Sequence, residues 1–192
     1  MQKQSFVQTT TATFPPIFLV GMMGSGKSYW CKAIVEHLQI DGIDLDAHIE
    51  KLYQQSISAI FYEKGEVFFR EIEAAALRTF GVKKNIVIAT GGGTPCFHDN
   101  MIWMNKHGIT IWIDEPATVL TERLWKEKAH RPLVAHVENR AALTQFLTAK
   151  IEERNHFYRL ADIHLKGEQL QINALLSAIR SFQNKSFNLN HS

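Results

Sequence analysis

The chain has 192 residues, of which 45% are hydrophobic and 21% charged, and its formal net charge is +2. These values are ordinary for one soluble domain with a real hydrophobic core. The net charge indicates nothing about binding of DNA or RNA, and no run of Lys or Arg suggests such a partner. No apolar run approaches the roughly 18 residues of a membrane span. The cysteines, Cys31 and Cys96, show neither a paired framework nor metal-ligand spacing, so both are expected to be reduced thiols in a cytosolic protein.

The chain divides into a leader, one domain and a tail. Residues 1–14 are polar and rich in threonine, and they lack the apolar or Arg-rich patterns of targeting signals. We therefore expect them to form a disordered leader. Residues 15–182 should form a single domain, and residues 183–192 should form a frayed, flexible tail.

Within the domain, short apolar runs alternate with helical patterns. Strands are expected at residues 17–20, 42–44, 85–89, 110–113 and 163–165. Helices are expected at residues 27–38, 66–80, 116–125, 139–158 and 170–182. This alternation indicates right-handed βαβ units, so the predicted fold class is α/β with a parallel five-stranded sheet flanked by helices. Such sheets bind ligands at the carboxyl ends of their strands.

The first expected strand leads into a phosphate-binding pattern. Residues 21–28 read Gly-Met-Met-Gly-Ser-Gly-Lys-Ser, which matches G-x-x-x-x-G-K-[ST]. The glycines let backbone N–H groups turn toward an anion, and the following helix N-terminus adds partial positive charge. Lys27 would reach the β- and γ-phosphates, and the Ser28 hydroxyl would bind Mg²⁺. An ordinary Gly-rich turn is the alternative, but the strand–loop–helix context favours a nucleoside triphosphate site.

Two aspartates follow the second expected strand, with one residue between them. Asp44 could hold Mg²⁺ beside a bound triphosphate, directly or through water. Asp46 could take a proton from a substrate hydroxyl. The alternative is that Asp46 only caps the helical residues 47–50, because Asp is a good N-cap residue. The neighbouring phosphate loop favours the catalytic interpretation.

The strand at 85–89 leads into three glycines. Gly91, Gly92 and Gly93 would let the backbone approach a ligand, and their N–H groups could donate to phosphate or hydroxyl oxygens. A flexible turn is the alternative. The buried strand before the glycines, which ends at the same edge as the phosphate loop, favours a binding role.

Two arginines lie in expected helices with a neighbour on the same face. Arg70 follows two phenylalanines and has Glu73 at i+3, which could fix its guanidinium; Arg154 has Tyr158 at i+4. A lone arginine is most often a solvated surface residue. Two arginines facing one pocket would instead favour a substrate carboxylate, which they can bind with bidentate hydrogen bonds.

Residues 126–137 interrupt the helical pattern with a basic loop that contains proline. Phosphoryl transfer benefits from a lid that excludes water and brings a cation to the transferred group. Arg131 is the best candidate for that cation, and Pro132 would stiffen its approach. The alternative is a solvent-exposed connection. The nine histidines show no metal-ligand spacing and are expected on the surface.

Taken together, these motifs resemble those of the shikimate kinases, a family of small P-loop kinases in aromatic amino-acid biosynthesis. The resemblance spans about residues 16–180 and keeps the order of the family's motifs. It rests on residues 21–28, Asp44-Leu45-Asp46, Gly65-Glu66, Phe69-Arg70 with Glu73, residues 91–93, Arg131-Pro132-Leu133, and Arg154 with Tyr158. It implies a three-layer P-loop fold with a substrate-binding helical region at about 45–75 and a lid at about 124–138.

The resemblance also implies the nucleotide and metal sites. Lys27 would contact the phosphates together with the rest of the loop, which comprises Gly21, Met22, Met23, Gly24, Ser25, Gly26 and Ser28. Ser28 and Asp44 would position Mg²⁺, and Arg131 would reach the phosphates from the lid. Arg123 is the nearest candidate for the arginine that the family places near adenine.

For the acceptor substrate, the resemblance implies that Asp46 binds the attacking hydroxyl and acts as, or assists, the base. Arg70 and Arg154 would bind the substrate carboxylate, and Gly91, Gly92 and Gly93 would line the pocket. The chain departs from the family in two places. The spacing from Arg123 to Arg131 is one residue longer, and Gly42 stands where phenylalanine is usual, which would loosen local packing and spare the chemistry.

The predicted activity is therefore transfer of the ATP γ-phosphoryl group to the 3-hydroxyl of shikimate. We expect a cytoplasmic monomer that uses Mg²⁺ and has neither a nucleic-acid nor a membrane partner. Two alternatives stay open. A related kinase, such as a gluconate kinase, would need a different acceptor site. A regulatory nucleotide-binding protein would not need Lys27, Asp46 and Arg131 intact.

Overall fold

The computed structural model describes residues 13–127, 134 and 137–189. Its strands are β1 (Ile17–Val20), β2 (Asp41–Asp44), β3 (Ile86–Ala89), β4 (Ile109–Asp114) and β5 (Ile163–Lys166). Its helices are α1 (Lys27–Leu38), α2 (Leu45–Tyr53), α3 (Ile57–Arg78), α4 (Asn100–His107), α5 (Ala117–Lys126), α7 (Arg140–Tyr158) and α8 (Ile172–Leu189). Two short 3-10 turns are η1 (Thr94–Cys96) and η3 (Gly167–Gln169).

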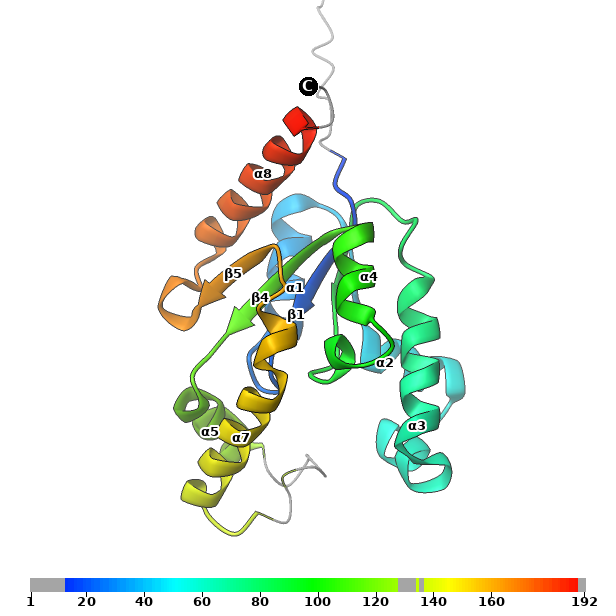
Figure 1. The fold of residues 1–192 in the computed structure, drawn as a ribbon, viewed down its shortest axis with the longest axis vertical. Helices are drawn as coiled ribbons and strands as arrows, with labels where there is room; N and C mark the ends of the chain where they lie inside the picture. The colour runs from blue at the N-terminus through cyan, green and yellow to red at the C-terminus, as the bar shows by residue number, and fades with distance from the viewer. Residues whose placement is uncertain (1–12, 128–133, 135–136, 190–192) are drawn as a thin grey trace, which may run out of the picture.

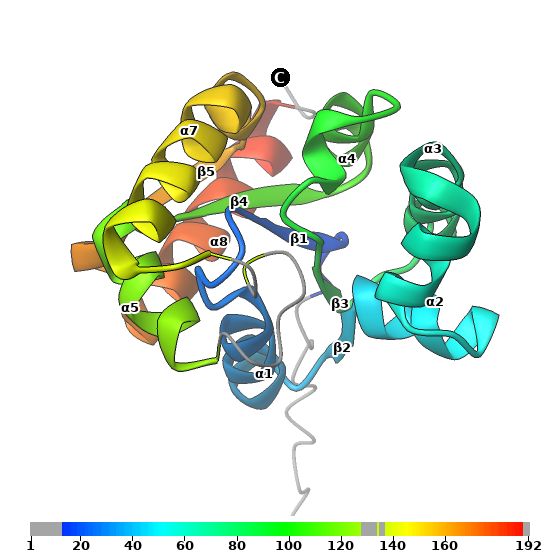
Figure 2. The same cartoon turned by 90° about the horizontal axis from the view of Figure 1, so that it is seen from below.

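The strands form one parallel five-stranded sheet in the order β2-β3-β1-β4-β5. This confirms the predicted fold class. Figures 1 and 2 show α1 and α8 on one side of the sheet, and α2, α3 and α4 on the other. Because β1 and β3 are neighbours and β2 lies next to β3, the segments that follow β1, β2 and β3 reach the same edge of the sheet.

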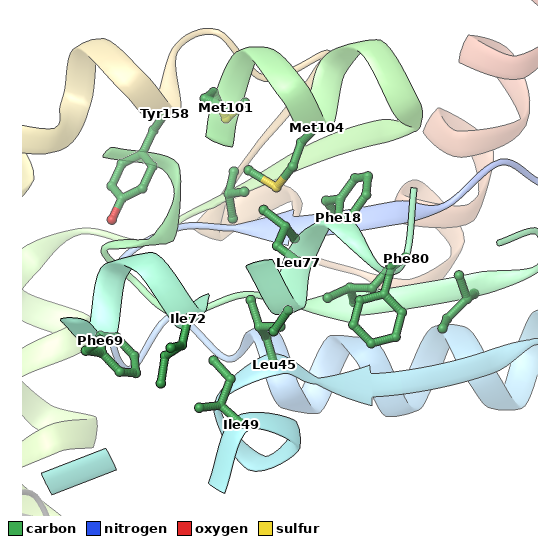
Figure 3. Packing of buried hydrophobic residues seen from close by; sticks show 14 of the residues in the cluster. Phe18, Leu45, Ile49, Phe69, Ile72, Leu77, Phe80, Met101, Met104 and Tyr158 are labelled. Carbon is green, nitrogen blue, oxygen red and sulfur yellow. The ribbon is translucent and has the colours of Figure 1, made fainter. Parts of the chain in front are cut away.

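Alternate side chains of β1 pack into the hydrophobic cores on opposite faces of the sheet. Phe18 and Val20 belong to the core between the sheet and α2, α3 and α4, whereas Ile17 and Leu19 belong to the core under α1 and α8. This period of two is what a strand buried on both faces requires. Figure 3 shows the core between the sheet and α2, α3 and α4, in which Phe18 lies near Leu77 of α3 and Met104 of α4.

A third apolar cluster lies where α5 packs on α7. It contains Leu120 and Leu124 of α5, Leu143 and Leu147 of α7, and Met22 of the phosphate-loop segment. The loop is thus attached to helices outside the sheet as well as to β1. Its position relative to α5 is therefore fixed by apolar packing.

Several element boundaries differ from those predicted. The helix α4 was not expected, and α2 was expected only as part of the helical region at about 45–75. The helix α3 begins at Ile57, nine residues before the predicted start at 66. Ser56 caps α3 by accepting a hydrogen bond from the Ala59 N–H. Gly65 has φ 80° and kinks α3, so the predicted helix corresponds to its second part.

The predicted leader and tail both extended too far into the folded region. Phe14 is 4% exposed, and its N–H donates to Asn85 Oδ1 at 2.8 Å. At the other end, α8 continues to Leu189, and Gln183 Nε2 donates to the Thr13 carbonyl at 2.8 Å. Residue polarity does not indicate the burial of Phe14 or the contact between Gln183 and Thr13, so the predicted leader and tail were both too long.

The predicted loosening at Gly42 is also corrected. A methyl group at Gly42 would collide with Val35 Cγ2 of α1, so that side chain occupies the place of a larger residue in β2. Cys31 lies nearby and contacts the Ile43 and Val87 carbonyls through its sulfur, at 3.7 and 3.6 Å. Burial raises the pKa of the Cys31 thiol, and both cysteines are unpaired.

Candidate active site

The phosphate-loop segment joins β1 to α1, as its sequence predicted. Gly21, Gly24 and Gly26 have φ values of 141°, 78° and 91°, which side-chain-bearing residues rarely adopt. Lys27 begins α1 and is 8% exposed. Its Nζ donates to the Gly21 and Met22 carbonyls at 2.8 and 2.9 Å, so the ammonium group lies against the loop's own backbone.

Ser28 and Asp44 are brought together by α1 and the end of β2. Ser28 Oγ donates to Asp44 Oδ2 at 2.5 Å, and the Ala47 N–H donates to Asp44 Oδ1 at 3.3 Å. Asp44, rather than Asp46, is therefore the N-cap of α2. This rules out capping as the role of Asp46, because Asp46 lies in the first turn of the helix.

Asp46 faces the first glycine of the triple-glycine segment. A methyl group at Gly91 would lie 3.0 Å from Asp46 Oδ1 and 2.9 Å from Glu73 Oε1, so the two carboxylates flank this backbone. Burial, followed by the negative charges of Glu73 and Asp44, raises the pKa of Asp46 from 3.8 to about 6. Lys27 and Arg70 act in the opposite direction. A carboxyl with this pKa suits proton exchange near neutral pH.

Arg70 belongs to an ionic network with one buried and one exposed carboxylate. Its Nη1 donates to Glu73 Oε2 at 2.8 Å, which confirms the predicted pair, and its Nη2 donates to Glu66 Oε1 at 3.0 Å. Glu73 is fully buried and also accepts from Thr94 Oγ1 at 2.6 Å. The Phe97 ring lies 4.4 Å from Arg70 Cζ. The whole Arg70 residue is 9% exposed, so its guanidinium is not a solvated surface group.

The triple-glycine segment lies between the two predicted arginines. A methyl group at Gly93 would come within 2.7 Å of Arg70 Nη2, and one at Gly92 would lie 3.4 Å from Arg154 Nη1. The Tyr158 hydroxyl donates to the Gly92 carbonyl at 2.6 Å, and burial raises the pKa of Tyr158. Both arginines therefore approach this backbone closely, which explains why side chains are absent from it.

A cleft of about 720 Å³ lies over the phosphate loop. Its lining includes Lys27, Ser28, Asp44, Asp46, Gly91 and Gly92. In the described part of the chain, Arg70, Gly93 and Arg154 are not among the residues that line this cleft; Arg154 lies beside the lining residue Gly92, and Arg70 lies beside Gly93. Lys27, Ser28, Asp44 and Asp46, which the sequence predicts at one edge of the sheet, thus line one cleft.

The helix α5 forms another wall of the cleft. Thr118, Glu122 and Arg123 line it, and Arg123 Nη1 donates to the Gly24 carbonyl at 3.2 Å. Arg123 Nη2 also donates to Glu115 Oε1 at 2.7 Å. The predicted lid residue Arg131 lies outside the described residues.

Sequence reasoning missed Thr94 and Glu115. Thr94 directly follows the three glycines, and Glu115 directly follows β4. Both residues follow the carboxyl end of a parallel strand, and this position could have identified them, since ligands bind at that edge.

Among the described residues, no group of three or more His, Cys, Asp or Glu could hold a metal ion by itself. None of the helices searched in the described chain is long and apolar enough to cross a membrane.

The parallel sheet, the phosphate loop and the acidic pair beside it define a P-loop nucleotide-binding enzyme. The family model described as shikimate kinase matches residues 23–182. The shikimate kinase of Phocaeicola vulgatus is 38% identical over 173 residues, which cover 88% of this chain and 98% of that protein. The chain therefore belongs to the shikimate kinase family and is a kinase.

Solved structures agree with this assignment. The shikimate kinase of Bacteroides thetaiotaomicron is 35% identical with a TM-score of 0.79, and the match covers 90% of this chain and 98% of that one. The Acinetobacter baumannii shikimate kinase, in complex with shikimate, is 31% identical with a TM-score of 0.76, covering 91% and 94%. A gluconokinase from Sinorhizobium meliloti is 17% identical with a TM-score of 0.55, which shows a common fold alone.

Proposed function

We propose that this chain transfers the γ-phosphoryl group of ATP to the 3-hydroxyl of shikimate, yielding shikimate 3-phosphate and ADP in aromatic amino-acid biosynthesis. One observation carries the proposal. The Asp46 carboxyl and the Arg70–Glu73 pair meet at the glycine segment, on the same sheet edge as Lys27. An alcohol and a carboxylate of one substrate can therefore be recognised beside a triphosphate.

The nucleotide phosphates would bind in the loop of residues 21–28. Lys27 would exchange its two carbonyl acceptors for phosphate oxygens, because a charged acceptor makes a stronger hydrogen bond than a neutral one. Ser28 and Asp44 offer the oxygen ligands that Mg²⁺ prefers when it is bound largely through substrate phosphates. When bound there, Mg²⁺ would neutralise charge on the phosphates.

The acceptor would bind against Gly91, Gly92 and Gly93, with Arg70 and Arg154 on its carboxylate. Asp46 would orient the hydroxyl and accept its proton as the oxygen attacks the γ-phosphorus and the bond to the β-phosphate breaks. Its pKa of about 6 leaves it mostly ionised at pH 7.5, and therefore able to accept the proton. Most of the catalysis would come from positioning and electrostatic stabilisation.

The roles of Arg131 on the phosphates and of residues 124–138 as a lid belong to the same proposal. They rest on the sequence, because Arg131 lies outside the described residues. Arg123 lines the same cleft beside Gly24 of the phosphate loop, and it would lie near the nucleobase, as the family resemblance implies. The cytoplasmic location and the monomeric state stay predictions, and size-exclusion chromatography with light scattering would test the second.

A coupled ADP-release assay tests the proposal, with shikimate and gluconate as alternative acceptors. We expect Mg²⁺-dependent turnover of shikimate and little turnover of gluconate, with ³¹P NMR identifying the 3-phosphate. Lys27→Ala serves as the control for contaminating kinases. A preference for gluconate would replace the proposed acceptor. Binding of ATP without turnover of either acid would favour a regulatory nucleotide-binding protein.

A further inference from the structure

Glu115 is a buried carboxylate at the carboxyl end of β4, one residue before the N-cap of α5. Its side chain is 6% exposed, whereas that of its partner Arg123 is 45% exposed. The pair is joined by the 2.7 Å hydrogen bond from Arg123 Nη2 to Glu115 Oε1. Burying a carboxylate is costly unless it is paired. The strand end therefore holds a fixed anchor for an otherwise flexible cation on the cleft wall.

Arg123 is held on a second side by the phosphate loop. Its Nη1 donates to the Gly24 carbonyl at 3.2 Å, and it lies 3.7 Å from the position that a methyl group at Gly26 would occupy. Both hydrogen bonds use N–H groups, which lie in the plane of the guanidinium. Neither hydrogen bond therefore uses the face of the guanidinium, and arginine faces stack readily on aromatic rings.

We propose that Glu115 is a positioning residue for nucleotide recognition, which acts by fixing Arg123 beside the phosphate loop before the nucleobase binds. The inference rests on the proposed function, in which Arg123 lies on the nucleobase side. An unrestrained arginine loses side-chain conformational entropy when a ligand immobilises it. Because Glu115 already restrains Arg123, most of that loss occurs on folding, and binding is favoured.

The turn η3 supports the same anchor from the other side. A methyl group at Gly167 would collide with Glu115 Oε2, so the carboxylate packs directly on the backbone that follows β5. Gly167→Ala should therefore displace Glu115 without altering any side chain that lines the cleft. This gives a second and independent way to disturb the Glu115–Arg123 pair.

The test is titration of the full-length protein with ADP by isothermal titration calorimetry. Glu115→Ala should raise the dissociation constant of ADP about tenfold, a factor consistent with loss of most of the arginine restraint. Glu115→Gln keeps an acceptor oxygen and should show a smaller rise. Kinetics should show a higher KM for ATP and an unchanged KM for shikimate. Glu36→Gln, on the exposed face of α1, is the matched control and should bind ADP like the wild type.

A double-mutant cycle separates this role from a purely structural one. If Glu115 acts through Arg123, then Glu115→Ala should have no further effect on ADP affinity when Arg123→Ala is already present. Additive effects of the two substitutions would overturn the inference. Unchanged ADP affinity in both Glu115→Gln and Gly167→Ala would also overturn it, even if Glu115→Ala failed to fold. Melting temperatures establish that each variant is folded during the titration.

Failure of the proposed function would look different from failure of this inference. A wild-type protein that binds ADP but does not phosphorylate shikimate would contradict the proposed acceptor, while the ADP cycle would still decide the role of Glu115. If Arg123→Ala leaves ADP affinity unchanged, Arg123 does not contact the nucleotide, and the inference about Glu115 is wrong.

Discussion

Replacing Asp46 with asparagine should stabilise the protein at neutral pH while it abolishes most activity. Burial and the charges of Glu73 and Asp44 raise the pKa of Asp46 from 3.8 to about 6. That rise corresponds to a cost on the order of 3 kcal/mol for ionising Asp46 in the folded protein. The asparagine side chain carries no charge and would not bear this cost. For a protein of this size the upper estimate of the gain is about 6–12 °C in melting temperature.

The sign of the pH dependence follows from which state binds more protons. Between pH 3.8 and about 6, Asp46 is protonated more in the folded protein than in the unfolded chain. Stability therefore falls as the pH rises through this window, and the penalty is fully present above it. The gain in melting temperature of Asp46→Asn over the wild type should be largest near pH 7.5 and should shrink toward pH 4.

Thermal unfolding from pH 4 to 8, without nucleotide or shikimate, measures this difference. Asp41→Asn at an exposed position of β2 is the matched control, and it should not show the same gain. Turnover of Asp46→Asn should fall by about 10²-fold or more, as expected for loss of a general base. An Asp46→Asn protein that melts below the wild type at pH 7.5, or gains equally at every pH, would refute the reasoning.

Three further substitutions test the acceptor site through steady-state kinetics and unfolding. Arg70→Ala removes charge-assisted bonds worth about 1.5–3 kcal/mol each, so KM for shikimate should rise at least about tenfold and KM for ATP should change little. A KM for shikimate equal to that of the wild type would refute the role of Arg70. Gly93→Ala places a methyl group within 2.7 Å of Arg70 Nη2 and should also raise KM for shikimate, whereas an unchanged value would separate Gly93 from the site. Tyr158→Phe removes the bond to the Gly92 carbonyl and should lower stability by about 1 kcal/mol, measured by urea unfolding; no change would mean that the bond contributes nothing.

The parts of the site that depend on local sequence were predictable. The phosphate loop and its strand–helix context fix Lys27 and Ser28 within a few residues, so spacing alone located them. The Arg70–Glu73 pair was found for the same reason, because residues three apart share a helix face. The parallel sheet followed from the alternation of strands and helices.

The parts that depend on packing between distant segments were not predictable. Asp44 accepts a hydrogen bond from Ser28 because β2 ends beside α1, and the spacing of Asp44 and Asp46 does not show which of them makes this contact. Thr94 was missed because its partner Glu73 is 21 residues away. The short helix α4 has mixed polarity around its circumference, so its sequence carries little periodic signal.

The network around Arg70 also indicates how an acceptor carboxylate could enter. Arg70 donates to two carboxylates of very different exposure, since the Glu73 side chain is 1% exposed and that of Glu66 is 56% exposed. A substrate carboxylate has to share or replace one of these acceptors. Releasing Glu66 costs less, because water can solvate an exposed carboxylate, whereas Glu73 would be left buried without its cation. We therefore expect the substrate to compete with Glu66 for Nε and Nη2 while Glu73, held by Thr94, keeps the guanidinium in place.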